Sequence, residues 1–120
     1  MRGYWNKPEA TASAFTDGWF HTGDAARQDE DGYYYIVDRW KDMFISGGEN
    51  VYPAEVENAI MGCPGVADAA VIGVPDERWG EAVTAIVVPA DPQADAAALA
   101  ERLVAQCRAA LGGFQVPKQV

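Results

Sequence analysis

The stretch that decides the fold of the second half of the chain is ISGGENVYPAEVE, residues 45–57. A short strand over residues 41–45 runs into Gly47 and Gly48, and paired glycines permit backbone conformations that are closed to other residues. Pro53 then stands where the first turn of a helix tolerates a missing N–H, and acidic residues follow near the positive end of the helix dipole. The stretch therefore predicts a strand, a tight loop and a helix in direct succession.

After this helix the chain alternates between strand and helix patterns. Residues 66–74 and 82–88 are rich in β-branched side chains and are predicted to form two strands, with a loop at residues 75–78 between them. Asp95 is placed to cap a further helix. The apolar stripe of that helix consists of Leu99, Leu103, Val104, Cys107 and Leu111. Residues 116–120 are predicted to begin another strand, and the whole half is expected to be a small α+β layer.

The first forty residues have a different composition, rich in Gly, Asp and aromatic side chains. A short helix is predicted over residues 7–15, and it ends before Asp17-Gly18. Residues 19–22 can form a strand, residues 25–28 lead into an acidic turn at residues 29–32, and residues 33–37 are a β-branched and aromatic run, so together they predict a hairpin. One hairpin and one short helix bury too little area to be stable alone, so this segment is expected to be the edge of a larger domain.

Composition and charge exclude several classes of function. Of the 120 residues, 49% are hydrophobic and 22% charged, which is an ordinary globular composition. The formal net charge of −9 would repel a polyanion, so neither nucleic acid nor an anionic membrane is expected as a partner. Two cysteines are too few for a disulfide framework, and a reducing cytoplasm is the expected compartment. No window approaches the roughly 18 apolar residues of a membrane span, so no transmembrane segment is expected.

Taken one at a time, the polar candidates each have an ordinary structural explanation. His21 is the only histidine and has no identifiable nucleophile partner, so a structural role is expected. Asp24 could accept two hydrogen bonds from a vicinal diol such as a ribose, or it could cap a turn. Asp38 and Arg39 could form a surface ion pair.

The aromatic and glycine candidates are equally open. Trp79 and Phe114 stand beside glycines and could line a ligand slot, or they could pack in the core. The paired glycines fit neither the GxxxxGK(S/T) nor the GxGxxG phosphate-binding pattern, and no spacing suggests a metal site. No single motif therefore identifies a function.

Together, however, the motifs form an ordered series. GWFHTGD at residues 18–24 is followed by GYYYIVDRWKD at residues 32–42 and by the stretch at residues 45–57. The series continues with VIGVPD at residues 71–76, WGE at residues 79–81, and Pro117-Lys118. In this order the motifs strongly resemble those of the adenylate-forming enzymes, the superfamily of acyl-CoA synthetases, peptide-synthetase adenylation domains and firefly luciferase. The likeness covers nearly the whole chain.

The sequence of residues 45–57 resembles that of the acyl-CoA synthetase branch, which implies fatty-acyl or medium-chain acids as the substrates. In this family a carboxylic acid and ATP give an acyl-adenylate and diphosphate, and the CoA thiol then displaces AMP. The resemblance therefore implies ATP, CoA and Mg²⁺. Two alternatives remain open: an aryl-acid or other carboxylate CoA ligase, and a stand-alone interaction module of the same fold.

The resemblance also implies a division of the chain. Residues 1–38 correspond to the tail of the large AMP-binding domain, residues 39–41 to a hinge, and residues 42–120 to a C-terminal lid domain with a hairpin and a mixed sheet packed with helices. The lysine that serves adenylation would lie beyond Val120, so the isolated chain is expected to be inactive. The face that packs on the large domain would be uncovered, which predicts self-association.

Individual residues acquire roles through the same resemblance. Asp24 corresponds to the carboxylate that holds the ribose hydroxyls of AMP or ATP, Arg39 to a basic group near the ribose and phosphates, and Lys41 to the hinge residue. The implied CoA-binding residues are Gly47, Gly48, Glu49, Trp79, Phe114 and Lys118. No catalytic residue and no metal ligand is implied within the chain. Family members often carry Lys or Arg just after the aromatic, where Gln115 and Val116 stand here, which weakens the expected contact to the nucleotide end of CoA.

Overall fold

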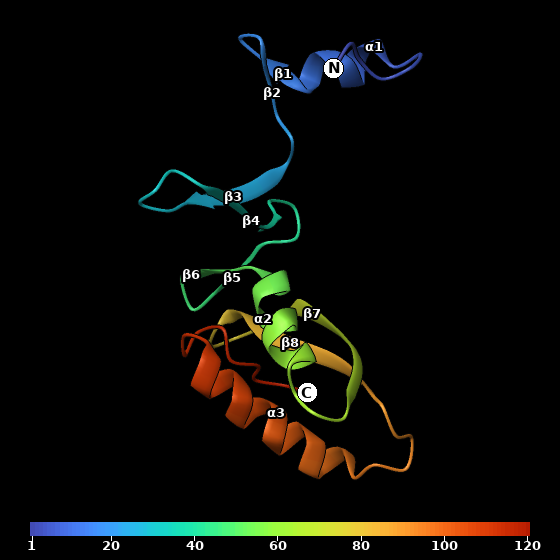
Figure 1. The fold of residues 1–120 in the computed structure, drawn as a ribbon, viewed down its shortest axis with the longest axis vertical. Helices are drawn as coiled ribbons and strands as arrows, with labels where there is room; N and C mark the ends of the chain where they lie inside the picture. Colours follow the sequence, from blue (N-terminus) through green and yellow to red (C-terminus); the bar gives the residue numbers. More distant parts are fainter.

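A computed structural model describes residues 1–120, and the chain is elongated, with extents of 52 × 36 × 33 Å (Figure 1). The small elements of the first forty residues lie toward one end, and a layer of sheet and helices forms the other end. The predicted α+β class is confirmed. None of the helices combines the length and the apolar character that a membrane crossing requires.

The first part of the chain contains one short helix and two hairpins. Its elements are α1 (Pro8–Ser13), β1 (Phe15–Thr16), β2 (Trp19–Phe20), β3 (Asp24–Gln28) and β4 (Tyr34–Arg39). The hairpin around the acidic turn was predicted, and so was a strand at residues 19–22, but that strand is only β2 and pairs with β1 in a small hairpin that was not predicted. Its turn residues Asp17 and Gly18 have φ of 50° and 83°, the two positive angles that a type I′ turn requires.

The acidic turn between β3 and β4 is organised by Asp29. Its carboxylate accepts hydrogen bonds from the N–H of Tyr33 at 2.9 Å and from the hydroxyl of Tyr35 at 2.8 Å. The bond from the Tyr33 backbone, followed by that from the Tyr35 side chain, lowers the pKa of Asp29 below its usual value. His21 has the structural role that was expected, because its Nε2 lies 2.9 Å from the hydroxyl of Thr16 across the β1–β2 hairpin.

The second part of the chain is built on one antiparallel sheet. Its elements are β5 (Phe44–Ser46), β6 (Glu49–Val51), α2 (Pro53–Met61), β7 (Val66–Asp76), β8 (Gly80–Pro89) and α3 (Ala96–Ala110). The strand order is β6-β5-β8-β7, and β7 and β8 pair along most of their length. β5 joins β8 through one residue pair, Ser46 with Gly80. The predicted strand, tight turn and helix are present, but the strand is β5 at Phe44–Ser46, and the unpredicted strand β6 stands between the turn and α2.

The strand predicted at residues 116–120 does not form. Only a single parallel bridge joins Gln119 to Thr84, so the sheet is mixed at this one point and antiparallel elsewhere. Two hydrogen bonds form the bridge. The N–H of Lys118 donates to the Val83 carbonyl, and the N–H of Ala85 donates to the Gln119 carbonyl.

Helices α2 and α3 cover one face of the sheet (Figure 1). The core between them holds Phe44, Val51, Val56, Ile60, Cys63, Val71, Val83, Ala85, Leu103, Cys107 and Val116. The opposite face carries exposed apolar side chains at Ile45, Ile72, Ile86 and Val88. Apolar burial therefore lies almost entirely on the helical side.

Helix α3 begins as the sequence predicts. The carboxylate of Asp95 accepts hydrogen bonds from the N–H groups of Ala97 at 2.9 Å and Ala98 at 3.2 Å, which satisfies two donors that have no partner within the helix. Leu103 and Cys107 are fully buried on the stripe that was predicted to face the sheet. Burial, followed by the nearby Cys63, raises the pKa of the Cys107 thiol, and both cysteines are free.

We expect Leu103→Ala to lower the free energy of unfolding by about 2–5 kcal/mol, because the fully buried side chain would leave a cavity between α3 and the sheet. Urea denaturation followed by circular dichroism measures the loss. Glu101→Ala is the matched control, since Glu101 is exposed on the same helix and its loss should stay within about 0.5 kcal/mol. Equal effects of the two substitutions would contradict this packing.

Candidate functional site

Asp24 and Arg39 lie side by side at the end of the β3–β4 hairpin. They are partners in the strand register, and Asp24 Oδ1 is 3.4 Å from Arg39 Nε. The N–H of Asp24 donates to the hydroxyl of Thr22 at 3.1 Å, and the N–H of Trp40 donates to the Gly23 carbonyl at 2.9 Å. The side chains are 30% and 59% exposed, so a carboxylate and a guanidinium are presented together to solvent.

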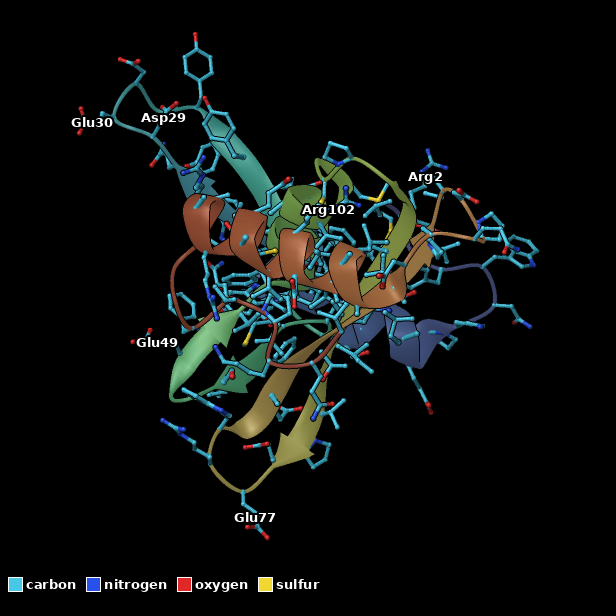
Figure 2. All side chains as sticks on the ribbon, turned by 90° about the horizontal axis from the view of Figure 1, so that it is seen from below. Arg2, Asp29, Glu30, Glu49, Glu77 and Arg102 are labelled. Atoms are coloured by element: carbon cyan, nitrogen blue, oxygen red, sulfur yellow. The ribbon has the colours of Figure 1, made fainter.

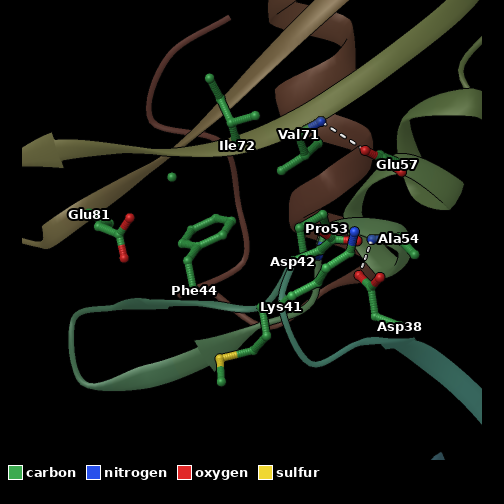
Figure 3. A pocket seen from close by; sticks show the side chains of 12 residues that line it. Asp38, Lys41, Asp42, Phe44, Pro53, Ala54, Glu57, Val71, Ile72 and Glu81 are labelled. Carbon is green, nitrogen blue, oxygen red and sulfur yellow. Dashed lines mark hydrogen bonds between the residues drawn. The ribbon is translucent and has the colours of Figure 1, made fainter. Parts of the chain in front are cut away.

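The ion pair considered between Asp38 and Arg39 is not formed. Arg39 pairs with Asp24 instead, because the antiparallel register places these two residues opposite one another. The carboxylate of Asp38 accepts a hydrogen bond from the N–H of Ala54 in α2 at 2.8 Å (Figure 3). Its other oxygen accepts from the N–H of Arg39 at 2.7 Å. Asp38 therefore connects β4 with the start of α2.

Lys41 lies at a pocket between β4, β5, α2, β7 and β8, which we call the hinge pocket after the role that the family resemblance implies for Lys41 (Figure 3). Its volume is about 490 Å³, and it is lined by Asp38, Lys41, Asp42, Met43, Phe44, Pro53, Ala54, Glu57, Val71, Ile72, Gly73 and Glu81. The carboxylate of Glu57 is engaged by the N–H of Val71 at 2.9 Å. No cluster of His, Cys, Asp or Glu side chains in the chain is arranged to hold a metal ion.

The paired glycines form the turn between β5 and β6. Gly47 and Gly48 have φ of 60° and 87°, which residues with a side chain rarely adopt. The N–H of Gly47 donates to the carbonyl oxygen of Trp79 at 2.9 Å. A Cβ at Gly47 would lie 3.0 Å from Cε3 of the Trp79 ring, whereas a Cβ at Gly48 would meet nothing within 4 Å. The indole of Trp79 therefore packs directly against the backbone at Gly47.

Two cations contact the ring of Trp79. The guanidinium carbon of Arg78 is 4.9 Å from the ring centroid, and Nζ of Lys118 is 4.8 Å from it. Lys118 Nζ also donates a hydrogen bond to the carbonyl of Gly113 at 3.0 Å. We call Gly47, Arg78, Trp79 and Lys118 the tryptophan cluster. It places aromatic area, bare backbone and positive charge together in a chain whose net charge is −9.

The charge of Lys118 is disfavoured by its surroundings. Burial, followed by the positive charges of Arg108 and Arg78, lowers the pKa of Lys118 below its usual value. None of these three cations forms an ion pair with a carboxylate, and the nearby Asp76 bonds the backbone N–H groups of Arg78 and Trp79. An anion that reached this surface would relieve their mutual repulsion.

The structure brings some of the predicted CoA-binding residues together and separates others. Gly47, Trp79 and Lys118 are in contact, and Gly48 is the next residue of the same turn. Glu49 is exposed on β6 and points outward, with no hydrogen bond or ion pair to the cluster (Figure 2). Phe114 is partly buried and packs against the hydrophobic core.

The positions after Phe114 face inward. The amide of Gln115 donates to Glu55 Oε2 at 2.8 Å and accepts from the N–H of Gly112 at 3.1 Å. Val116 is buried in the core. Gln115 and Val116 therefore contribute to the packing of α2 and of the segment after α3. Neither side chain is presented at the surface for a contact with the nucleotide end of CoA.

Arg78 was missed by sequence reasoning. The turn before it is shaped by Asp76, whose Oδ1 accepts from the N–H groups of Arg78 at 2.8 Å and Trp79 at 2.9 Å. An aspartate that bonds the backbone two residues later is a turn signal, and it fixes the direction in which Arg78 and Trp79 emerge. The spacing of Asp76, Arg78 and Trp79 was thus the signal available in the sequence.

The second part of the chain is thus an α+β layer with a glycine hairpin packed on a tryptophan, and a short connection joins it to the β-rich first part. Residues 55–120 match the family described as the AMP-binding enzyme C-terminal domain. The chain belongs to this family, and the predicted family resemblance is confirmed.

Curated and solved relatives extend the match over the whole chain. The feruloyl-CoA synthase of an Amycolatopsis species is 59% identical over 100% of the chain, which covers 24% of that protein. The long-chain-fatty-acid–CoA ligase FadD13 of Mycobacterium tuberculosis is 54% identical over 100% of the chain and 23% of its own length. The structure of o-succinylbenzoate CoA synthetase from Bacillus subtilis with its acyl-adenylate intermediate matches with a TM-score of 0.87 at 36% identity, over 100% of this chain and 24% of that one. The chain thus spans about a quarter of the length of these relatives.

Two glycine substitutions separate backbone strain from contact with Trp79. Gly47→Ala and Gly48→Ala should each lower the free energy of unfolding by about 1–3 kcal/mol, because both positions have positive φ. Only Gly47→Ala should displace the ring of Trp79, since only there is a Cβ close to it. The indole N–H signal of Trp79 in a ¹H–¹⁵N spectrum reports this displacement. An equal shift of that signal in both variants would contradict the packing of Trp79 on Gly47.

Proposed function

We propose that the chain is the C-terminal part of an ATP-dependent acid–CoA ligase, which converts a carboxylic acid, ATP and CoA into acyl-CoA, AMP and diphosphate through an acyl-adenylate. The observation that carries the proposal is the tryptophan cluster. Gly47 removes side-chain bulk beside an indole, and two cations stand over that indole. Such a surface suits a flexible, uncharged arm that ends in phosphates, which is the chemistry of CoA.

In the adenylation half of the reaction, this chain would contribute Asp24 and Arg39. The carboxylate of Asp24 can accept hydrogen bonds from the two hydroxyls of a ribose. Arg39 is held beside it at 3.4 Å, and its planar guanidinium is proposed to bind the ribose and phosphate region of the same nucleotide. ATP with its Mg²⁺ would be bound largely by the rest of the protein, because the chain offers no metal-holding cluster of its own.

In the thioester half, the lid would present the tryptophan cluster to CoA. The pantetheine arm would pass the backbone at Gly48, where no side chain lies within 4 Å, next to the indole that covers Gly47. The indole of Trp79 would contact the apolar part of the arm, and Arg78 and Lys118 would attract its phosphates. Lys41, at the hinge pocket, is the proposed pivot between the two arrangements.

A fatty acid is the acid that we propose first. The support is the match to FadD13, whose name states a long-chain fatty acid. An aryl acid is the second candidate, because the feruloyl-CoA synthase relative is 59% identical over the same residues. No residue discussed above belongs to an acyl pocket, so the choice between the two acids depends on residues outside this chain.

The isolated chain is proposed to be inactive and to associate with itself. Large aromatic side chains in its first part are open to solvent, among them Trp5 at 95% and Trp19 at 80% exposure. An apolar surface of this kind is expected to be covered by the large domain, or by a second copy when that domain is missing.

A chimera tests the proposed function directly. FadD13 would receive residues 1–120 of this chain in place of its own matching segment, and the chimera is expected to form acyl-CoA only with ATP and CoA present. Trp79→Ala in the chimera should slow thioester formation roughly 10-fold or more while leaving ATP–diphosphate exchange near its original rate.

Tyr33→Ala is the matched control, since Tyr33 is an exposed aromatic in the β3–β4 turn, away from the cluster. Equal slowing of both half-reactions by Trp79→Ala would argue against a role for the cluster in the thioester step. A folded chimera without either half-reaction would contradict the proposed function. Thioester formation by the isolated chain would contradict its proposed inactivity.

A further inference from the structure

The N-terminus of helix α2 is capped by Asp38, a residue of β4 and not of the segment that directly precedes the helix. Tyr52 stands at the N-cap position but makes no side-chain hydrogen bond to the helix, and Pro53 has no N–H. The N–H of Ala54 is therefore the first donor of the helix that needs a partner. Asp38 provides it, with Oδ2 at 2.8 Å from the Ala54 nitrogen in a partly buried setting (Figure 3).

Asp38 is fixed to the β3–β4 hairpin. It is the strand partner of Ala25, and its second carboxylate oxygen is held by the N–H of Arg39 at 2.7 Å. The next residue, Trp40, donates its N–H to the Gly23 carbonyl at 2.9 Å. The carboxylate thus moves with the hairpin, whereas Ala54 moves with α2 and the sheet that α2 covers.

The hydrogen bond between Asp38 and Ala54 spans Lys41. The covalent connection at this point is a turn. In it the N–H groups of Asp42 and Met43 donate to the Arg39 carbonyl. A second contact also spans Lys41: the rings of Trp40 and Tyr52 pack edge to face with their centroids 6.5 Å apart. Rotation of the backbone at Lys41 would move Ala54 relative to Asp38 and separate both contacts.

We infer that Asp38 is a positioning residue whose carboxylate, as a cap on α2 from across the hinge, holds the lid in the orientation seen here. The inference rests on the proposed function for one point, that the lid changes orientation between the two half-reactions. An acidic cap at a helix N-terminus is favoured by both hydrogen bonding and the helix dipole. Its loss should lower the ratio of this orientation to all others roughly 5- to 10-fold.

Residual dipolar couplings of the ¹⁵N-labelled chain measure the orientation directly. In the unmodified chain, one alignment tensor should fit both the β3–β4 hairpin and the segment from β5 to α3. In Asp38→Ala the two segments should require different tensors, because they move independently. Asp42→Ala is the matched control: it removes the same charge at the same pocket, and Asp42 makes no side-chain hydrogen bond to α2.

Hydrogen exchange keeps the test decisive if Asp38→Ala also disturbs the fold. Asp38→Asn retains the size and one acceptor but not the charge, so the Ala54 amide should exchange a few-fold faster while the amides of Leu103 and Cys107 stay protected. One common tensor in Asp38→Ala, or unchanged Ala54 exchange in Asp38→Asn, would overturn the inference.

The FadD13 chimera separates this inference from the proposed function. There, Asp38→Ala should change the ratio of ATP–diphosphate exchange to thioester formation about 5-fold, and Asp38→Asn should restore most of it. An inactive unmodified chimera would count against the proposed function alone, because the dipolar couplings of the 120-residue chain do not depend on activity. An unchanged ratio in an active chimera would overturn the positioning role of Asp38.

Discussion

The two hairpins of the C-terminal part meet at one point, and the rest of this part depends on it. There Ser46 pairs with Gly80, and the N–H of Gly47 donates to the carbonyl of Trp79 at 2.9 Å. This approach requires a residue without Cβ at positive φ, because a side chain at Gly47 would press on the indole. The same constraint that joins β5 to β8 thus creates the glycine turn and the partly buried indole on which the proposed CoA surface is built.

The two proposed half-sites lie on opposite sides of Lys41. Asp24 and Arg39 belong to the β3–β4 hairpin, whereas the tryptophan cluster belongs to the sheet beyond the hinge pocket. Between them the chain makes few contacts, chiefly the cap from Asp38 and the ring pair of Trp40 with Tyr52. A connection of this kind is what the proposed hinge motion at Lys41 requires.

Local patterns predicted the elements well, because their signals lie within a few residues of one another. The glycines of the β5–β6 turn and the cap at Asp95 are examples. Long-range partners escaped prediction: the register of β3 and β4 decides that Asp24 pairs with Arg39, and the hydrogen bond from Ala54 to Asp38 crosses sixteen positions. The family resemblance selected Trp79 and Lys118 among several aromatic and basic residues, but it could not show that Glu49 points away or that Gln115 faces Glu55.

The central claim is that the tryptophan cluster is the surface of this chain that receives CoA. Titration of the ¹⁵N-labelled chain with CoA, followed in ¹H–¹⁵N spectra up to the solubility limit, tests it most directly because the spectra detect weak binding residue by residue. We expect concentration-dependent shifts at Gly47, Gly48, Trp79 and Lys118, with the β3–β4 hairpin unaffected. Shifts confined to the hinge pocket or to the hairpin, or no shift at the cluster at the highest concentration, would contradict it.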